Sequence, residues 1–532
     1  MKTLSDRLLH DAVVEKIWKH DPSTWKAAPG SADAKSIETR LGWLDVGQTM
    51  KPHMAAVHGL RDQVRDEKFE AAYLLGMGGS SLCAEVLRSV FGIADGHPQL
   101  YVLDTTDEQT ITTAASRMDP ARTLFIVASK SGGTVEVASM ERFFWARMQA
   151  ALGEDAGRHF VAITDPGTAL QSLAAQRGYR EVFINPPDIG GRFSALSLFG
   201  LVPAAVIGAP VDALLAGGAA MAAGCHQHNH TNAGLELGAF IGAAALAGRD
   251  KLTVALAPSF ASLGLWIEQL VAESTGKHEK GVLPVVDEPL GRPDEYGTDR
   301  AFVSVASESD APEEERLKAL EAAGHPVLRL SMRHDGLGAE FFRWEFATAV
   351  AGAALGVNPF DEPNVSEAKD KTKALLASYA ANGRFDDQPA PPSAAAVRET
   401  IAAIRPGDYV AFLSYLPGET DVESTVAEIR QALRAKTSAA STFGLGPRYL
   451  HSTGQYHKGG PNTCVAFVLT ADDESATPVP EAGYSFAVLK RAQALGDVQA
   501  LEAHGRRVLR LHFKNASTAA EELEGLFTEA MA

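Results

Sequence analysis

The sequence predicts an α/β protein built from parallel β-sheets that are covered on both faces by helices. Two observations indicate this class: short apolar runs alternate with amphipathic stretches, and this alternation restarts twice along the chain. A third is the length of 532 residues, which exceeds one ordinary core and suggests lobes of about 150 residues each. We therefore expect two three-layer αβα lobes followed by a C-terminal α/β lobe.

The first lobe is expected over residues 66–235, after a helical lead-in at residues 1–65. The lead-in places tryptophans and charged residues at helical spacing. In the lobe, apolar runs predict strands at Ala71–Leu75, Gln99–Leu103, Thr123–Ala128 and His159–Thr164. The stretches between them predict helices at Ser81–Phe91, Val135–Met148 and Thr168–Gln176.

The second lobe is expected over residues 236–380 and the third over residues 397–532. The predicted strands of the second are Leu252–Leu256, Ala301–Ala306 and Val327–Leu330, and its helices are Leu263–Glu273, Glu313–Ala323 and Phe342–Gly356. The predicted strands of the third are Tyr409–Tyr415, Cys464–Leu469 and Val508–Leu511, and its helices are Val422–Arg434 and Ala487–Leu495.

A linker at residues 381–396, rich in proline and polar residues, separates the last two lobes. A short sequence echo also relates these lobes. Leu320–Leu330 and Leu501–Leu511 are identical at eight of eleven positions. A partial duplication and two helix–turn–strand units that converged on similar sequences both explain the echo.

The composition excludes several classes of protein. The formal charge of −17 repels nucleic acid and anionic membranes, so an anionic ligand must be held by a local pocket. The N-terminus lacks the apolar segment of a secretory signal, and prolines, glycines and Asp212 interrupt the longest apolar stretch, at Phe199–Gly224. Cys83, Cys225 and Cys464 are too few and too scattered for a disulfide framework or a structural zinc site. We expect a soluble, cytoplasmic protein without nucleic-acid or membrane partners.

Two loops each follow a predicted strand and open a predicted helix, which places both at the carboxyl edge of one sheet, where α/β proteins bind ligands. The first, Gly76–Leu82, contains Gly78, Gly79 and Ser80. Its glycines let the backbone approach a ligand, and the helix N-terminus attracts anions. A tight turn without a ligand is one alternative. A nicotinamide-dependent dehydrogenase is another, although Ser81 replaces the third glycine of the dinucleotide fingerprint.

The second loop, Ser129-Lys130-Ser131-Gly-Gly-Thr134, combines hydroxyl groups, free backbone N–H groups and one lysine charge. This set of donors suits a terminal phosphate dianion. We expect Ser129, Lys130, Ser131 and Thr134 to bind the phosphate group, with a solvated loop as the alternative.

This second loop resembles the phosphosugar-binding loop of SIS (sugar isomerase) domains, and three further segments narrow the resemblance to the phosphoglucose isomerase family. Ile189–Ser194 is similar to its Gly-Gly-Arg-aromatic-Ser segment, Gln269–Lys277 to its Glu-Ser-x-Gly-Lys signature, and Asn358–Lys369 to its Asn-Pro-Phe-Asp signature, which ends in lysine. The resemblance covers about residues 65–375. With its extra C-terminal lobe, the chain is most like the isomerase portion of bacterial transaldolase–isomerase fusions.

The resemblance implies two SIS lobes and an aldose–ketose isomerase that interconverts glucose 6-phosphate and fructose 6-phosphate through a cis-enediolate, with no cofactor or metal. Such a reaction needs a base near neutral pH, and a carboxylate must be partly desolvated to serve as one. Glu273 is the implied base, although a glutamate in the last turn of an apolar helix is unremarkable by itself. The alternative is a non-catalytic SIS sensor that only binds a phosphosugar.

Two cations are implied for the same reaction. A fixed cation stabilises an anionic enediolate, and Arg192 matches the family's arginine in that role, although a surface arginine would look the same in sequence. Lys369 matches the lysine that contacts the ring oxygen, although Lys371 and Lys373 continue a solvated helix. The implied partners are the sugar phosphate, a second copy of the chain in a homodimer, and a functionally associated transaldolase.

The family's ring-opening histidine has no counterpart between the glutamate and lysine signatures, where Arg300 stands and His278 is out of place. Leu450–Gln455 resembles the His-Ser-x-Gly-Gln segment of shorter bacterial isomerases, so we expect His451 to assist ring opening, with a structural loop as the alternative. The histidine cluster at Cys225–His230 has the residue types of a metal site. A polar turn that closes a helix is the favoured interpretation, because the implied chemistry needs no metal.

Overall fold

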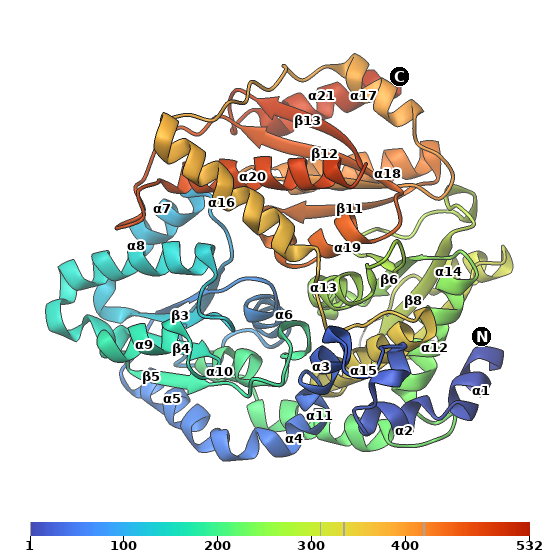
Figure 1. The fold of residues 1–532 in the computed structure, drawn as a ribbon, viewed down its shortest axis with the longest axis horizontal. Helices are drawn as coiled ribbons and strands as arrows, with labels where there is room; N and C mark the ends of the chain where they lie inside the picture. Colours follow the sequence, from blue (N-terminus) through green and yellow to red (C-terminus); the bar gives the residue numbers. More distant parts are fainter. Residues whose placement is uncertain (1, 309, 334–335, 419–420) are drawn as a thin grey trace.

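The computed structural model describes residues 2–308, 310–333, 336–418 and 421–532, and its described strands form three parallel sheets (Figure 1). The first sheet consists of β1 (Ala71–Leu75), β2 (Gln99–Leu103), β3 (Thr123–Ala128), β4 (Phe160–Thr164) and β5 (Glu181–Ile184). The second consists of β6 (Lys251–Leu256), β7 (Leu283–Val285), β8 (Arg300–Ala306) and β9 (Val327–Ser331). The third consists of β10 (Tyr409–Ser414), β11 (Ala440–Leu445), β12 (Cys464–Ala471) and β13 (Arg507–Phe513). The predicted α/β class is confirmed.

The first three strands of each sheet are arranged in the same order. Their orders are β2-β1-β3-β4-β5, β7-β6-β8-β9 and β11-β10-β12-β13, so the first strand of each sheet lies between the second and the third. In such sheets the connections leave in opposite directions beyond the carboxyl ends of the first and third strands, which opens a crevice there. In the first sheet, the loops at residues 76–81 and 129–134 follow these two strands.

The sequence echo lies at equivalent places in the second and third sheets. One copy covers the end of α14 (Glu314–Ala322) and most of β9, and the other covers the end of α20 (Phe486–Ala503) and most of β13. In both cases a helix leads into the edge strand beside the third strand of its sheet. This placement supports a duplication rather than two unrelated units.

The other helices cover the sheets, and five of them form the lead-in. The lead-in consists of α1 (Lys2–His10), α2 (Val13–Trp18), α3 (Ala32–Glu38), α4 (Val46–Thr49) and α5 (Met54–Asp66). The first lobe has α6 (Leu82–Phe91), α7 (Glu108–Arg117), α8 (Val135–Leu152), α9 (Ala169–Gln176) and α10 (Leu198–Val206). The remaining helices are α11 (Val211–Cys225), α12 (Ala233–Leu246), α13 (Leu263–Thr275), α15 (Leu337–Leu355), α16 (Val365–Asn382), α17 (Ala394–Ala402), α18 (Val422–Thr437), α19 (Gly454–Gly459) and α21 (Ala519–Met531). No helix in the described ranges has the length and apolarity needed to cross a membrane.

Three edge strands are absent from the sequence-based prediction: β5, β7 and β11. Their position at an edge is not the reason by itself, because the edge strands β2, β9 and β13 were predicted. The three missed strands have a weak or very short apolar pattern. β5 has a single fully buried residue, β7 has three residues around a proline, and the second half of β11 is partly exposed. The central strands, which are buried along most of their length, were predicted to within about one residue.

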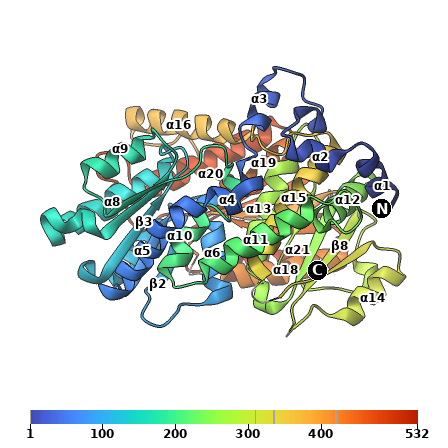
Figure 2. The same cartoon turned by 90° about the horizontal axis from the view of Figure 1, so that it is seen from below.

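The lead-in helices belong to the main core. One continuous cluster of buried apolar side chains runs from Leu4 to Phe360 and joins the lead-in to the first two lobes. Within it, the indole of Trp25 donates a hydrogen bond to the carbonyl of Ala349 on α15 at 2.9 Å. Figure 2 shows α4, α10 and α11 side by side along the underside of the molecule.

The third lobe has one apolar cluster of its own, shares a second with α13 and β7, and adds Val479 and Phe486 to the apolar cluster of the first lobe. Polar contacts also join it to the first lobe. Lys490 Nζ lies 2.9 Å from Asp107 Oδ2, and the Thr106 hydroxyl donates to Gln493 Oε1 at 2.7 Å. The long helix α16 packs against α20, as the gold and red helices in Figure 1 show. These contacts hold the third lobe over the carboxyl edge of the first sheet.

Candidate active site

The predicted site residues meet at one cavity of about 350 Å³ at the junction of the three lobes. Its size is within the range of small-molecule pockets, about 300–1,000 Å³. The predicted residues that line it are Gly78, Gly79, Ser80, Lys130, Ser131, Thr134, Arg192, Glu273, Lys369 and His451. Residues that are more than three hundred positions apart in the chain thus line the same cavity.

Two glycines let the first loop pack tightly against its neighbours. Gly78 has a φ of +54°, and a Cβ there would lie 2.5 Å from the carbonyl oxygen of His451. A Cβ on Gly79 would lie 2.1 Å from the carbonyl oxygen of Gly191. The loop is therefore in backbone contact with the segments that carry Arg192 and His451.

The second loop forms a cradle of donors at the N-terminus of α8, which has 18 residues. Ser131 and Thr134 line the cavity, and the positive end of the helix dipole faces the same place. Ser129 is buried behind the cradle, where its hydroxyl lies 3.0 Å from Thr134 Oγ1. Ser129 thus positions Thr134 and does not itself reach the cavity.

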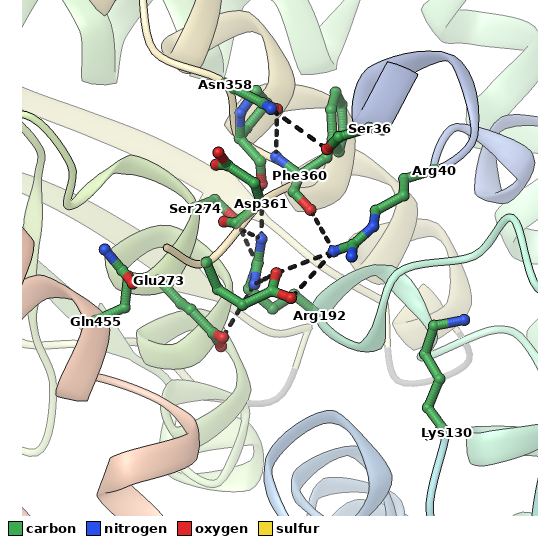
Figure 3. Close-up of polar contacts among 12 residues, drawn as sticks. Ser36, Arg40, Lys130, Arg192, Glu273, Ser274, Asn358, Phe360, Asp361 and Gln455 are labelled. Carbon is green, nitrogen blue, oxygen red and sulfur yellow. Dashed lines mark hydrogen bonds and ion pairs between the residues drawn. The ribbon is translucent and has the colours of Figure 1, made fainter. Parts of the chain in front are cut away.

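Lys130 lies at the edge of the cavity, away from the network around Arg192 (Figure 3). Its ammonium group contacts the carboxylate of Asp165 and donates to the carbonyl of Pro187 at 3.0 Å. Burial raises the pKa of Asp165, although Lys130 opposes this shift. The charge of Lys130 is therefore shared with a carboxylate that also lines the cavity.

Glu273 lies in the last turn of α13, as predicted, and its carboxyl group faces the cavity. The residue is 6% exposed, and its Oε2 accepts a hydrogen bond from Gln269 Nε2 at 3.1 Å. Burial raises the pKa of Glu273, and the guanidinium of Arg192, 3.0 Å from Oε1, opposes that rise. A desolvated carboxylate beside a fixed cation suits a base that works near neutral pH.

Contacts to every nitrogen of its guanidinium group fix Arg192 in place (Figure 3). Its Nε donates to the hydroxyl of Ser274 at 3.1 Å, and one terminal nitrogen donates to the carbonyls of Pro359 and Asp361. The other terminal nitrogen lies 3.1 Å from Glu362 as well as beside Glu273. The guanidinium therefore cannot turn away from the base.

Lys277 joins two of the segments that carry the family resemblance. Its ammonium group donates to Asp361 Oδ1 at 2.6 Å and contacts the carbonyl of Asn358. Burial, with the nearby charge of Arg192, lowers the pKa of Lys277 to about 8. The lysine fixes the Asn358–Asp361 turn whose carbonyls hold Arg192.

His451 reaches the cavity from the short helical turn Arg448–His451 of the third lobe. Its Nε2 lies 2.9 Å from Glu136 Oε1, and its carbonyl accepts from Gln269 Nε2 at 2.8 Å. Glu136 also accepts from Gln493 at 2.7 Å. Burial favours a higher pKa for Glu136, but the adjacent histidine outweighs it and lowers the pKa below its ordinary value. Lys369, on an exposed part of α16, lines the same wall.

The sequence-based prediction did not select several residues of the site. Glu136, Gln269, Glu362, Arg40 and Asp165 belong to the same site, the last four in the cavity wall and Glu136 behind His451. Glu136 could have been selected from the sequence, because it lies in the first turn of a helix that follows a donor-rich loop. The others are ordinary polar residues in sequence, and their roles come from tertiary contacts.

The alternative candidates lie elsewhere. Arg300 is fully buried in β8 and makes a two-pronged ion pair with Glu288, at 3.0 and 3.1 Å. His278 is exposed just after α13. Of the histidine cluster, His226 stacks on Trp18 with ring centroids 3.6 Å apart, and His230 bonds to Glu236 and Asp6. The described residues contain no group of three or more potential ligands that could hold a metal ion.

The chain is similar to several known proteins. Residues 59–287 match the family model described as phosphoglucose isomerase. The glucose-6-phosphate isomerase of Rubrobacter xylanophilus is 29% identical over 396 residues, which are 64% of this chain and 90% of that protein. The enzyme of the same name from Carboxydothermus hydrogenoformans is 27% identical over 405 residues, 64% of this chain and 86% of that protein.

Two solved structures share the fold. A hypothetical protein from Thermus thermophilus superposes with a TM-score of 0.62 at 25% identity, over 71% of this chain and 97% of that one. A glucose-6-phosphate isomerase from Chlamydia trachomatis superposes with a TM-score of 0.56 at 18% identity, over 71% of this chain and 86% of that one.

Proposed function

We propose that this chain, whose residues 59–287 match the phosphoglucose isomerase family model, interconverts glucose 6-phosphate and fructose 6-phosphate in the cavity around Glu273. One observation carries this proposal. The buried carboxyl of Glu273, the guanidinium of Arg192 and the donor cradle at Ser131 and Thr134 line a single cavity. A base and an anion site in one pocket are what proton transfer on a phosphorylated sugar requires.

The phosphate group is held at the N-terminus of α8 by Ser131, Thr134 and backbone N–H groups, with Lys130 at the rim. Ser129 supports this cradle from behind through Thr134. Gly78, Gly79 and Ser80 border the sugar. Binding the phosphate away from the base fixes the position of the sugar carbons relative to Glu273.

Proton transfer takes place at Glu273. Its carboxylate removes the proton from C2 of the open aldose and returns it to C1, while the oxygen-bound proton moves from O2 to O1. The intermediate is a cis-enediolate, and Arg192 stabilises its negative charge without having to reorient. Gln269 holds the carboxylate in place.

Ring opening precedes this step and is assigned to His451 and Lys369. His451 exchanges a proton with the ring oxygen or the anomeric hydroxyl, and Glu136 holds its Nε2 side in position. Lys369 supplies a mobile positive charge near the ring oxygen. The support for these two roles is their place on the cavity wall.

The substitution Glu273→Gln tests the mechanism because it keeps the size of the side chain and removes the base. We expect isomerisation to fall by about 10²–10⁴-fold, while sorbitol 6-phosphate, which has no carbonyl group to isomerise, binds as it does to the wild type. Glu279→Gln, an exposed glutamate just beyond the same helix, is the matched control. Near-normal turnover in Glu273→Gln would refute the role of this carboxylate.

Three further proposals concern the setting of the enzyme. A homodimer and a functional association with a transaldolase are supported by the resemblance alone, and a cytoplasmic location by the three free, buried cysteines. Light scattering of the purified chain tests the dimer, and co-purification from the native host tests the transaldolase. The domain limits of 66–235, 236–380 and 397–532 are likewise proposed, and limited proteolysis tests them.

A further inference from the structure

A second cavity lies where the three lobes meet and is separate from the catalytic cavity. It has a volume of about 110 Å³ and is bordered by α6, α13, α18 and the end of β11. It adjoins a groove of about 560 Å³ along β2, and four residues line both spaces: Leu265, Asp287, Glu423 and Arg448. The inner cavity can therefore be reached from the groove.

Glu268 is the unusual residue of this cavity. It is 7% exposed and lines the inner cavity, and its carboxyl group accepts no hydrogen bond from any residue in the described ranges. The carboxyl oxygens of Glu268 are not among the fully enclosed atoms that lack a partner in the described residues, so they open onto the cavity and their missing partner is a molecule within it. The neighbouring glutamate on the same helix, Glu273, does have such partners.

The charges around Glu268 indicate what the missing partner is. Asp287, Arg430 and Arg448 act on it electrostatically, and Glu423 and Tyr449 line the same cavity. Arg430 donates to Val286 and Ser441 through Nε and one terminal nitrogen, and its other terminal nitrogen has no hydrogen-bond partner among the described residues. Burial, with the charge of Asp287, raises the pKa of Glu268 to about 8. Three carboxyl groups thus border a small space together with two guanidinium groups, of which that of Arg448 is already paired with Asp104.

We propose that this cavity binds a small primary amine, whose ammonium group donates hydrogen bonds to Glu268 and Asp287 and whose apolar end packs against Leu82 and Leu265. An ammonium group has three donors and one positive charge, which match the two carboxylates. A neutral alcohol of the same shape would supply one donor and no charge. The site therefore selects for charge as well as for size.

The wall of this cavity also touches the catalytic machinery. Arg448 Nε donates to Asp104 Oδ2 at 2.8 Å, and the hydroxyl of Ser81 lies 3.2 Å from that same oxygen and from the carbonyl of Gly78. Arg448 also begins the short turn that ends at His451. We infer that an amine beside Arg448 changes the kinetics of isomerisation through these two connections.

Calorimetric titration tests the binding site without requiring turnover, so its result is independent of the catalytic proposal. The probes are propylamine and its neutral isostere 1-propanol, titrated at pH 6, 7 and 8 in buffers of different ionisation enthalpy. We expect propylamine alone to bind, and to bind more tightly as the pH rises. At pH 7 binding should release protons, because the ammonium group favours the ionised form of Glu268.

The variant Glu268→Gln should bind propylamine at least about tenfold more weakly and release no protons. Glu428→Gln, an exposed glutamate on α18 outside the cavity, should behave as the wild type. Equal binding of 1-propanol, no binding of propylamine, or unchanged binding in Glu268→Gln would each overturn the site. An unchanged KM and kcat for fructose 6-phosphate at saturating propylamine would overturn the coupling, and thermal unfolding confirms that each variant is folded.

Discussion

His451 Nε2 lies 2.9 Å from Glu136 Oε1, although 315 positions separate the two residues in the chain. Glu136 belongs to the first turn after the phosphate cradle, and His451 belongs to the third lobe. Gln493, also from the third lobe, donates to the same carboxylate. The third lobe thus forms one wall of the cavity that we propose as the active site.

Replacing His451 should slow ring opening more than proton transfer. We expect His451→Gln to reduce the exchange between the two anomers of glucose 6-phosphate, measured by ¹³C exchange NMR, by about 10²-fold or more. Glu136→Gln should have a smaller effect in the same direction, because it removes the partner and keeps the imidazole.

His504→Gln is the control, since its pair with Glu367 at 2.6 Å lies outside the cavity. Anomer exchange at the wild-type rate in both His451→Gln and Glu136→Gln would contradict the assignment.

Replacing Arg192 should have two effects. Arg192→Ala removes the cation beside the enediolate, and we expect kcat to fall by about 10²–10³-fold. The same change removes the group that opposes the raised pKa of Glu273, so that pKa should rise further. The acid limb of the pH profile of kcat/KM should then move to higher pH, because the base must be ionised.

Arg40→Ala is the matched control, because Arg40 also contacts Glu362 but is not paired with the base. A pH profile of Arg192→Ala that keeps the wild-type acid limb would show that Arg192 does not act on Glu273.

Glu345 in α15 predicts a pH dependence of stability. It is fully buried, neither carboxyl oxygen has a hydrogen-bond partner in the described ranges, and burial raises its pKa well above the ordinary value. The folded protein therefore keeps a proton that the unfolded chain releases above about pH 4.3. Its contribution to the free energy of unfolding falls by about 1.4 kcal/mol per pH unit above that point, until the folded pKa is reached.

The variant Glu345→Gln removes the ionisable group, and with it the loss of unfolding free energy at high pH. We expect it to be more stable than the wild type at pH 8 and to show a smaller advantage at pH 5, measured by urea unfolding. Glu524→Gln, exposed on α21, should show no such difference. A Glu345→Gln variant that loses stability equally at both pH values would mean that Glu345 has a polar partner.

The close approach of Gly79 to Gly191 predicts that even one methyl group is not tolerated there. Gly79→Ala would place its Cβ 2.1 Å from a backbone oxygen, and we expect a loss of about 1–3 kcal/mol in stability together with lower activity. Gly59→Ala, in the middle of α5 with nothing within 4 Å, should instead stabilise the protein by about 0.5–1 kcal/mol. Thermal unfolding and kcat/KM measure both, and an active, stable Gly79→Ala would show that the two loops can move apart.

The central strands and the two donor-rich loops could be predicted from sequence because buried parallel strands are apolar along their whole length. β5, β7 and β11 could not, because β5 has only one fully buried residue, β7 is three residues around Pro284, and β11 includes Ser441, Thr442 and Gly444. Glu273, the proposed base, was selected through the segment around it. Neither the burial of Glu273 nor its 3.0 Å contact with Arg192 is visible in sequence.

The positions of His451 and Ser129 show the limits of the prediction in opposite ways. His451 could be selected from a local motif, but its contact with Glu136 depends on how the third lobe packs on the first. Ser129 has the right chemistry for a phosphate ligand, yet the turn directs its hydroxyl to Thr134. Local patterns identify the chemistry, while the packing decides which groups reach the substrate.

The common winding of the three sheets has a consequence for how this catalyst is organised. In the proposed mechanism, the first lobe binds the phosphate group, the second supplies the base Glu273, and the third supplies the imidazole of His451. The proposed catalytic groups are therefore divided among three lobes of the same strand order instead of being concentrated in one. Each lobe can then change in sequence wherever another lobe carries the function. The partial identity of Leu320–Leu330 and Leu501–Leu511 is what remains after such change.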